Sequence, residues 1–390
     1  MKKTIFTALA LAIVLTPAFA DDKKETKKAE QKPRIEVCFV LDTTGSMGGL
    51  IAGAKDKIWS MANEMISAKP TPEIRIGLIG YRDKTDAYVT KVYPLSNDID
   101  DIYAKLMAFK AQGGGDTPES VNQALSEGIT KMKWSKSRKV LKVIFLVGDA
   151  PPHMDYKQDV PYLDSCKLAM KKDIIINTIQ CGSMASTTPI WQEIARKAEG
   201  KFARILQGGG VIAIATPFDK EIAACNAKLG HTVCVYGDAR AQRFATSKVT
   251  LADSAPASAA ADRLEYLSKA KAGEDAFSEV ISGGGDLVDL LANKKMKLAD
   301  IEEKKLPEKV RKMKPKEREA YFATQIADRK KLQTELTGLL KKRSSFVIAK
   351  KAELKKAGKG DGFDEKVSGF IREQAAKKGF RYEEEKAPKK

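Results

Sequence analysis

Histidine is scarce in this 390-residue chain, which contains only His153 and His231. This scarcity argues against zinc sites built from several imidazoles and against hydrolases built on a Cys-His pair. The sequence also lacks a Gly-x-Ser-x-Gly elbow, and no triple glycine is followed by the Gly-Lys-Ser/Thr of a phosphate-binding loop. These absences favour a binding protein over a nucleophilic hydrolase, and we expect no enzymatic activity.

Long hydrophobic runs are also missing, and the run from Ile5 to Leu15 is too short for a confident membrane span. Two lysines precede this run and Ala18-Phe19-Ala20 follows it, which is the pattern of a secretory signal peptide. We therefore predict a signal peptide over residues 1–20, cleavage near Ala20, and a periplasmic or secreted protein. Export disfavours nucleic acid as a partner.

Acidic residues are outnumbered, because 69 Lys and Arg face 51 Asp and Glu and the net charge is +18. This surplus indicates an anionic surrounding, such as an acidic envelope polymer or an anionic lipid surface. Part of it lies in residues 21–33, which are almost all charged or small and are typical of a flexible linker. More lies in residues 263–390, which are rich in Lys, Glu, Leu and Ala.

Apolar β-rich runs alternate with helical stretches after Ile35, which is typical of a doubly wound α/β domain over residues 34–229. We expect a six-stranded, mostly parallel sheet. One of the six strands, 87–95, follows its neighbour too closely for a helical crossover and is predicted to pair antiparallel at an edge. The other expected strands are 35–41, 74–81, 140–147, 174–179 and 201–206. The expected helices are 49–68, 98–110, 118–132, 159–172, 189–199 and a closing helix over 217–229.

The texture changes again after this domain. Ala, Ser and Asp dominate the end of residues 230–262, which we interpret as a linker, and residues 263–390 as a basic helical region. Its longest expected helix, 316–356, has a rough apolar stripe compatible with coiled-coil packing, although the spacing is irregular. Two interpretations stay open: a solvated helical hairpin that packs on itself, and a basic arm that docks on a partner.

Hard oxygen ligands follow the expected strands at one edge of the sheet, where open α/β folds bind their ligands. Asp42, Thr44 and Ser46 follow the first strand, Asp149 follows the strand 140–147, and Thr117 lies in a glycine-rich loop. Carboxylate and hydroxyl oxygens are suited to Mg²⁺, with Mn²⁺ as the next choice. The sequence therefore predicts a cation site made of these five residues.

This pattern resembles the metal ion-dependent adhesion site (MIDAS) of the von Willebrand factor type A (VWA) family, Asp-x-Ser-x-Ser followed by Thr and Asp, with Thr44 in place of a Ser. The resemblance covers residues 34–229. It implies that hydroxyls touch the metal, that carboxylates often act through water, and that a partner's Asp or Glu fills the open position. Several phrases are similar to a bacterial exported subgroup, namely VLDTTGSMGGLI, GLIGYRD, GGGDTPESVNQAL, FLVGDAPPH and IIINTIQCG.

Three further residues were considered as supports of the cation site. Asp116 either reaches the metal's surroundings or is a turn residue after three glycines, and Asp83 either steadies the site or lies in a surface turn. His153 is either a general base or a polar residue that orders the Pro-Pro loop. The second interpretation is preferred for His153 and for Asp83.

The five cysteines leave at least one thiol without an internal partner. Cys225 and Cys234 flank the end of the closing helix, where a disulfide would pin that helix. A second bridge, Cys166 to Cys181, is compatible with a helix that runs back along the sheet. Buried free thiols are the alternative for both pairs.

The function predicted from these observations is cation-dependent binding of a protein ligand that presents Asp or Glu, as an adhesion or scaffold protein. One alternative is a structural envelope-assembly protein that acts through its basic helical tail. A second alternative is a metal-assisted hydrolase, for which His153 and Asp116 are the candidate bases.

Overall fold

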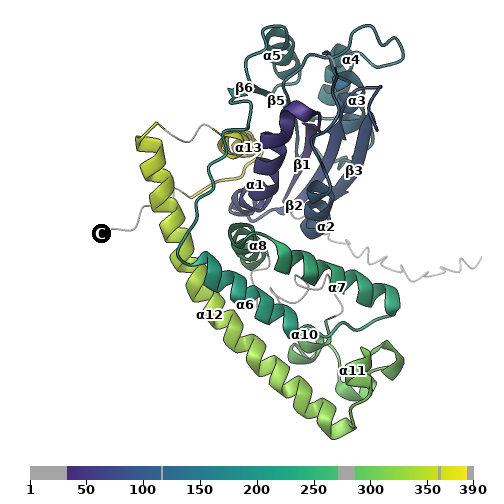
Figure 1. Ribbon diagram of the computed structural model, residues 1–390, viewed down its shortest axis with the longest axis vertical. Helices are drawn as coiled ribbons and strands as arrows, with labels where there is room; N and C mark the ends of the chain where they lie inside the picture. The colour runs from purple at the N-terminus through teal and green to yellow at the C-terminus, as the bar shows by residue number, and fades with distance from the viewer. Residues whose placement is uncertain (1–32, 116, 271–285, 359–361, 384–390) are drawn as a thin grey trace, which may run out of the picture. The chain divides into compact units, whose positions relative to one another are not determined.

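The computed structural model describes residues 33–115, 117–270, 286–358 and 362–383. At its centre is a six-stranded sheet with the strand order β3-β2-β1-β4-β5-β6 (Figure 1). All neighbouring strands are parallel except β3, which runs antiparallel to β2 at one edge. The predicted fold class is therefore confirmed. The strands are β1 (Arg34–Asp42), β2 (Glu73–Tyr81), β3 (Thr90–Ser96), β4 (Leu141–Gly148), β5 (Ile175–Cys181) and β6 (Phe202–Ile205).

The central strands are apolar at nearly every position because both faces of the sheet are covered by helices. Phe39 and Phe145 stack on one face, with ring centroids 5.6 Å apart, and Ile144 points to the other face. The first face is covered by α1 (Gly48–Ile66) and α13 (Phe363–Lys377), with α2 (Ile99–Met107) beside them. The second face is covered by α3 (Val121–Thr130), α4 (Tyr162–Lys171) and α5 (Thr187–Lys197).

Helix α13 comes from the end of the chain, yet it belongs to the core of the α/β unit. Phe363 is fully buried and meets the ring of Phe39 edge-on at 6.1 Å. The amides of Asn177 in β5 and Gln374 exchange hydrogen bonds of 3.0 and 2.7 Å. Residues 263–390 were all predicted to form a separate helical region, whereas α13 completes the layer beside α1.

The closing helix is observed as α6 (Asp219–His231), but it packs on α8 (Ala257–Ala270) and on α12 (Pro315–Lys356). Residues 230–262, predicted as a linker, instead contain α7 (Ala239–Ser254) and the beginning of α8. Three of the small residues that suggested a linker, Ala259, Ala260 and Ala261, are buried, and their size lets α8 approach its neighbours closely. Two short helices, α10 (Leu287–Ala292) and α11 (Glu308–Arg311), precede α12.

Helix α8 attaches the helical region to the α/β unit. The guanidinium of Arg263 binds both carboxylate oxygens of Asp100 at 2.6 and 2.9 Å, and this pair is buried. The rings of Trp59 in α1 and Tyr266 in α8 lie 5.8 Å apart. Aromatic packing and a buried ion pair thus join α8 to the α/β unit. The hydrophobic core also continues from the sheet into the helical region.

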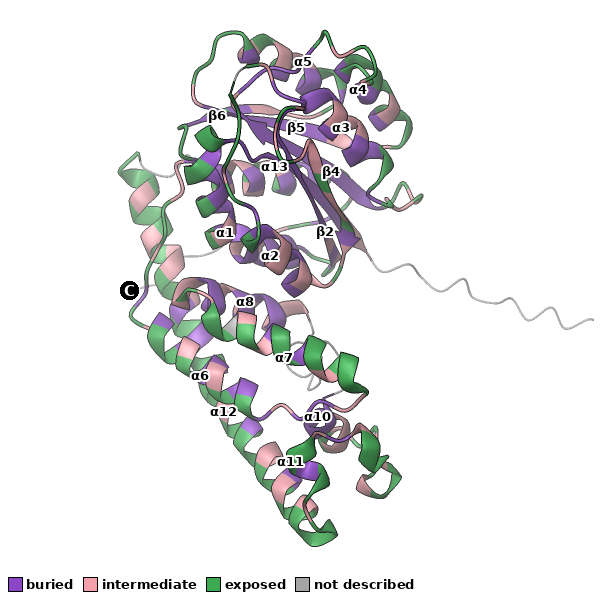
Figure 2. Cartoon of the chain, turned by 45° about the vertical axis from the view of Figure 1, so that its right-hand side comes forward, coloured by how far each residue is buried: buried purple, intermediate pink, exposed green. Residues whose placement is uncertain are grey.

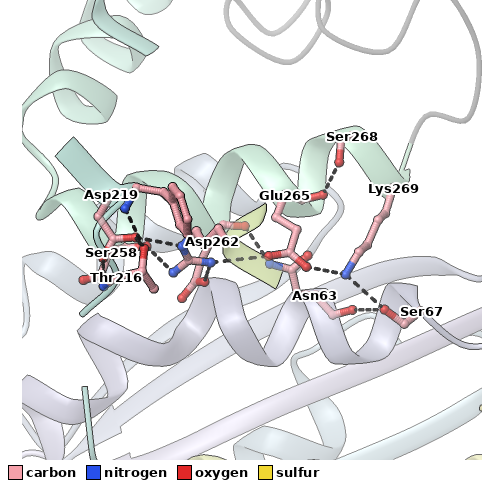
Figure 3. Close-up of polar contacts among 11 residues, drawn as sticks. Asn63, Ser67, Thr216, Asp219, Ser258, Asp262, Glu265, Ser268 and Lys269 are labelled. Atoms are coloured by element: carbon pink, nitrogen blue, oxygen red, sulfur yellow. Dashed lines mark hydrogen bonds and ion pairs between the residues drawn. The ribbon is translucent and has the colours of Figure 1, made fainter. Parts of the chain in front are cut away.

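The long helix α12 is tied to α6 and α8 by one buried arginine. Arg343, which is 3 % exposed, lies 2.9 Å from Asp219 Oδ1, 2.7 Å from Asp262 Oδ1 and 3.4 Å from Glu265 Oε2. Figure 3 shows these three acidic residues with their polar contacts, which extend to Asn63 on α1. The cluster therefore joins three helices of the helical region to one another beside α1.

Most of α12 is solvent-exposed, and its buried residues lie on the side that faces the other helices (Figure 2). It packs against α6, α8 and α10, so the predicted hairpin that packs on itself is not what the structure contains. None of the helices in the described parts of the chain is long and apolar enough to span a bilayer.

All five cysteines are buried free thiols, so neither predicted disulfide is formed. Cys166 lies in the core on the α4 side of the sheet, whereas Cys181 points to the α1 side, because alternate residues of a strand face opposite ways. Cys225 lies in the main core, and Cys234 belongs to a separate cluster with Leu287 and Phe322. Position along the chain had suggested proximity that the fold does not provide.

Candidate metal centre

The loop after β1 folds into a compact turn around the carboxylate of Asp42. This carboxylate is 0 % exposed, and its Oδ1 accepts hydrogen bonds from the backbone N (2.8 Å) and the hydroxyl (2.6 Å) of Thr44. The Thr44 hydroxyl lies 3.3 Å from the hydroxyl of Ser46, which is exposed. The predicted residues Asp42, Thr44 and Ser46 are therefore brought together, with Ser46 nearest to solvent.

Asp149 follows β4 and lies beside this turn. The negative charge of its carboxylate helps to raise the pKa of Asp42. Its Oδ2 accepts a hydrogen bond of 2.7 Å from Gln207. Gly148 is required here because a Cβ at this position would lie 2.4 Å from the Tyr81 hydroxyl and 3.1 Å from Asp42 Oδ2. The close approach of β4 to β1 thus brings the two aspartates to one place.

The third loop brings a buried carboxylate that was not predicted. Thr117 is exposed, whereas Glu119, two residues later, is 3 % exposed. The backbone of Glu119 is fixed by hydrogen bonds of 2.9 Å to Pro151 O and 3.0 Å from His153 N. Sequence analysis missed Glu119, although a carboxylate just before an apolar helix on the glycine-rich loop was an available signal.

Asp42 and Glu119 are buried acids whose negative charge is poorly stabilised by their surroundings. Burial raises the pKa of Asp42 to about 7, and the hydrogen bonds from Thr44 only partly oppose this. Burial raises the pKa of Glu119 to about 9, and the negative charge of Asp42 is the next largest cause. Two buried acids of raised pKa at one edge of a sheet are typical of a functional site.

Three buried oxygens at this edge have no hydrogen-bond partner: Asp42 Oδ2, Glu119 Oε2 and the Tyr81 hydroxyl. A buried polar atom without a partner costs about 1–3 kcal/mol, which a cation at this place would recover. Their oxygen chemistry suits a hard divalent cation. No three His, Cys, Asp or Glu side chains in the described residues can hold a metal by themselves, so hydroxyls and water would have to complete the shell.

Asp83 and His153 lie next to the site in a separate cluster. Asp83 is buried and accepts hydrogen bonds of 2.8 Å from the Ser120 and Tyr156 hydroxyls. His153 stacks on Tyr156 at 4.0 Å, and its ring nitrogens lie 2.8 Å from Asp155 Oδ1 and 3.6 Å from Asp83 Oδ1. Asp83 thus supports the loop that carries Glu119, while Asp116 lies outside the described residues.

Arg82 and the glycines connect the loops that carry these residues. The Arg82 guanidinium donates to Thr43 O at 3.1 Å and to Lys110 O at 2.8 Å. Gly113 has φ +79°, and a Cβ there would lie 1.9 Å from Asp86 Oδ1, so only glycine is accommodated. The Asp86 carboxylate in turn accepts a hydrogen bond from Gly114 N at 3.1 Å. The glycine run is therefore a backbone requirement of the site.

Comparison with known proteins supports this description of the sheet domain. Residues 36–215 match the family model described as the von Willebrand factor A domain. A relative, an ariadne-like RING finger protein of Acanthamoeba polyphaga mimivirus, is 28 % identical over 119 residues, which are 30 % of this chain. The chain spans 11 % of the length of that curated relative.

Several solved structures are similar to a part of the chain. The conserved hypothetical protein BatB from Bacteroides thetaiotaomicron is 16 % identical with a TM-score of 0.35, over 44 % of this chain and 90 % of that chain. The SpRpn10 VWA domain is 15 % identical with a TM-score of 0.35, over 45 % and 89 %. Proximal thread matrix protein 1 from the mussel byssus, with a zinc-occupied MIDAS motif, is 14 % identical with a TM-score of 0.36, over 45 % and 42 %.

Proposed function

Since this chain is a von Willebrand factor A domain-containing protein, we propose that it binds a protein partner through a divalent cation at the edge of its sheet. Asp42, Thr44, Ser46 and Asp149 would hold the cation, and Thr117 is the hydroxyl that the family pattern adds. One observation carries the proposal: the fully buried Asp42 carboxylate has an oxygen, Oδ2, without a hydrogen-bond partner. The hydroxyls of Thr44 and Ser46 lie in the same turn.

Mg²⁺ is the cation that we propose, with Mn²⁺ as a substitute. The donors are carboxylates and hydroxyls, which both ions accept, and neither Cys nor His lies among the proposed ligands. Mg²⁺ usually retains several of its waters, so one water on the exposed Ser46 side can be exchanged for an oxygen of a partner. An Asp or Glu side chain of the partner would supply that oxygen.

We further propose that the protein works outside the cytoplasm, in the periplasm or as a secreted protein. The basis is the N-terminal pattern of two lysines, an apolar run and Ala18-Phe19-Ala20, which precedes the described residues. The excess of 18 positive charges favours weak attraction to acidic envelope polymers or anionic lipid. This attraction would raise the local concentration without selecting the partner.

A hydrolase finds less support from the residues around the site. His153 is the only histidine of the neighbouring loops. Its Nδ1 is hydrogen-bonded to Asp155 at 2.8 Å, whereas its buried Nε2 lies 3.6 Å from Asp83 Oδ1 and has no hydrogen-bond partner. A hydrolysis assay of the wild-type protein and His153→Ala would separate the two functions. A hydrolase should show cation-dependent turnover that His153→Ala loses, whereas a binding protein should show no turnover in either form.

The direct test is Mn²⁺ binding to the full-length mature protein, measured by electron paramagnetic resonance and calorimetry. Asp42→Ala should abolish binding, whereas Asp164→Asn, an exposed carboxylate on α4, should leave it unchanged. Partner capture should then need Mg²⁺, fail in EDTA, and fail with Asp42→Ala. Equal Mn²⁺ binding by the wild-type protein and Asp42→Ala would reject the proposed site.

A further inference from the structure

We propose that Glu119 is the third acidic group of the cation site and acts on the cation through its bound water. The proposal rests on the cation-binding function proposed above and adds a residue that the Asp-x-Thr-x-Ser, Thr and Asp pattern does not contain. It gives the glycine-rich loop a carboxylate in the site in addition to the hydroxyl of Thr117.

The Glu119 carboxylate and the Asp-x-Thr-x-Ser turn both border the position of Gly114. A Cβ built on Gly114 would lie 2.9 Å from Thr44 Cβ and 3.4 Å from Glu119 Oε1. One small volume therefore borders both the Asp-x-Thr-x-Ser turn and the Glu119 carboxylate. The side chain is 3 % exposed, so it is shielded from bulk water.

A second feature is the missing compensation of charge. Glu119 Oε2 is buried without a hydrogen-bond partner, as is Asp42 Oδ2. Lys and Arg side chains near the site are used elsewhere: Arg82 is bound to backbone carbonyls, and Lys84 contacts Asp159 at 3.4 Å. A divalent cation with its hydration shell is the partner whose charge and donors match both orphaned oxygens.

Water-mediated contact explains why three acidic groups occur without forming a tight cluster. The described acidic, His and Cys side chains contain no ready-made group of three metal ligands. Mg²⁺ keeps several waters in protein sites, and each of these waters donates hydrogen bonds outward. Carboxylates that accept such hydrogen bonds orient the inner ligands, and their loss typically weakens metal affinity by about 10- to 100-fold.

Thr117 and Glu119 lie on the same loop but differ in burial. Thr117 is exposed, whereas Asp42 and Thr44 are almost fully buried, and the residue of its loop that shares their burial is Glu119. Glu119 is also fixed by its backbone to the loop that follows Asp149, through Pro151 and His153. Movement of the Asp149 loop on cation binding would therefore carry Glu119 with it.

The experiment measures Mn²⁺ affinity by calorimetry, and thermal melting in EDTA and in Mn²⁺, for four forms of the full-length protein. These are the wild-type protein, Glu119→Gln, Glu119→Asp and the control Asp164→Asn. Glu119→Gln should bind Mn²⁺ about 10- to 100-fold more weakly. In EDTA it should melt at or above the wild-type temperature, because the amide removes a buried carboxylate that has no partner.

Glu119→Asp retains the charge and should recover part of the affinity, while Asp164→Asn, which removes an exposed carboxylate of α4, should bind as tightly as the wild-type protein. Equal affinity of Glu119→Gln and wild-type protein would overturn the proposal. Equal losses in Glu119→Gln and Glu119→Asp, together with lower melting in EDTA, would show a structural role instead and would also overturn it. Absence of Mn²⁺ binding by the wild-type protein would reject the proposed function itself.

Discussion

Arg343→Met should destabilise the packing of α12 on α6 and α8. Arg343 is the cation shared by Asp219, Asp262 and Glu265, and methionine keeps the aliphatic volume while removing the charge. The three carboxylates come from α6 and α8 (Figure 3). Removal of the Arg343 charge should therefore weaken the contact of α12 with these two helices.

Removal of one partner from a buried ion pair costs about 3–5 kcal/mol, because the remaining charge is left without compensation. The side chains of Asp262 and Glu265 are each 15 % exposed, which allows some hydration and favours the lower end, about 3 kcal/mol. The entropy of unfolding grows with chain length, so in a unit as large as Pro33–Lys390 about 1.4 °C of melting temperature is lost per kcal/mol, and we expect a decrease of roughly 4 °C.

The difference should shrink as the pH is lowered from 7.5 towards 5. Burial raises the pKa of Asp262 above its ordinary value, while the nearby Arg343 opposes this rise. Without Arg343 the folded-state pKa rises further, the folded variant binds more protons than the unfolded chain, and acidification stabilises it. The wild-type protein gains less from the same acidification.

Urea unfolding followed by circular dichroism at both pH values measures these differences. Arg196→Met, which removes an exposed arginine of α5, is the matched control and should be nearly neutral. The reasoning is refuted if Arg343→Met is as stable as Arg196→Met at pH 7.5, or if its deficit grows on acidification.

Three other predictions concern the core, the site and the thiols. Phe363→Ala should cost about 3–5 kcal/mol in urea unfolding, because α13 covers the sheet; a loss no larger than that of a surface residue would contradict the placement of this helix. Apparent Mn²⁺ affinity should rise about tenfold from pH 6 to pH 8, because the cation must displace the proton of Asp42, whose pKa burial raises to about 7; calorimetry showing constant affinity would contradict this. Alkylation without reductant should modify all five cysteines in denaturant and almost none in the native protein, and incomplete labelling in denaturant would reveal a disulfide.

The layers of the α/β unit were predictable from local pattern. Continuous apolar runs of strand length, separated by helical stretches, specify a parallel sheet covered on both faces, and the short connection before residues 90–96 specifies the antiparallel edge. The helical region was not predictable in this way. Small residues such as Ala259 and Ala261 carry no strong hydrophobic signal, but they allow close helix contact when a partner helix is present.

The sequence by itself determined that Asp42, Thr44, Ser46 and Asp149 follow strands that end at one sheet edge, because chain order and parallel pairing leave them no other place. Only the tertiary structure decided that Glu119 is buried there while Thr117 is exposed, since this depends on how the glycine loop is held by distant residues. In the same way, only the tertiary structure decided that α13 completes the sheet layer and that the cysteines stay apart. Long-range packing, which no local spacing records, is the physical reason for each of these outcomes.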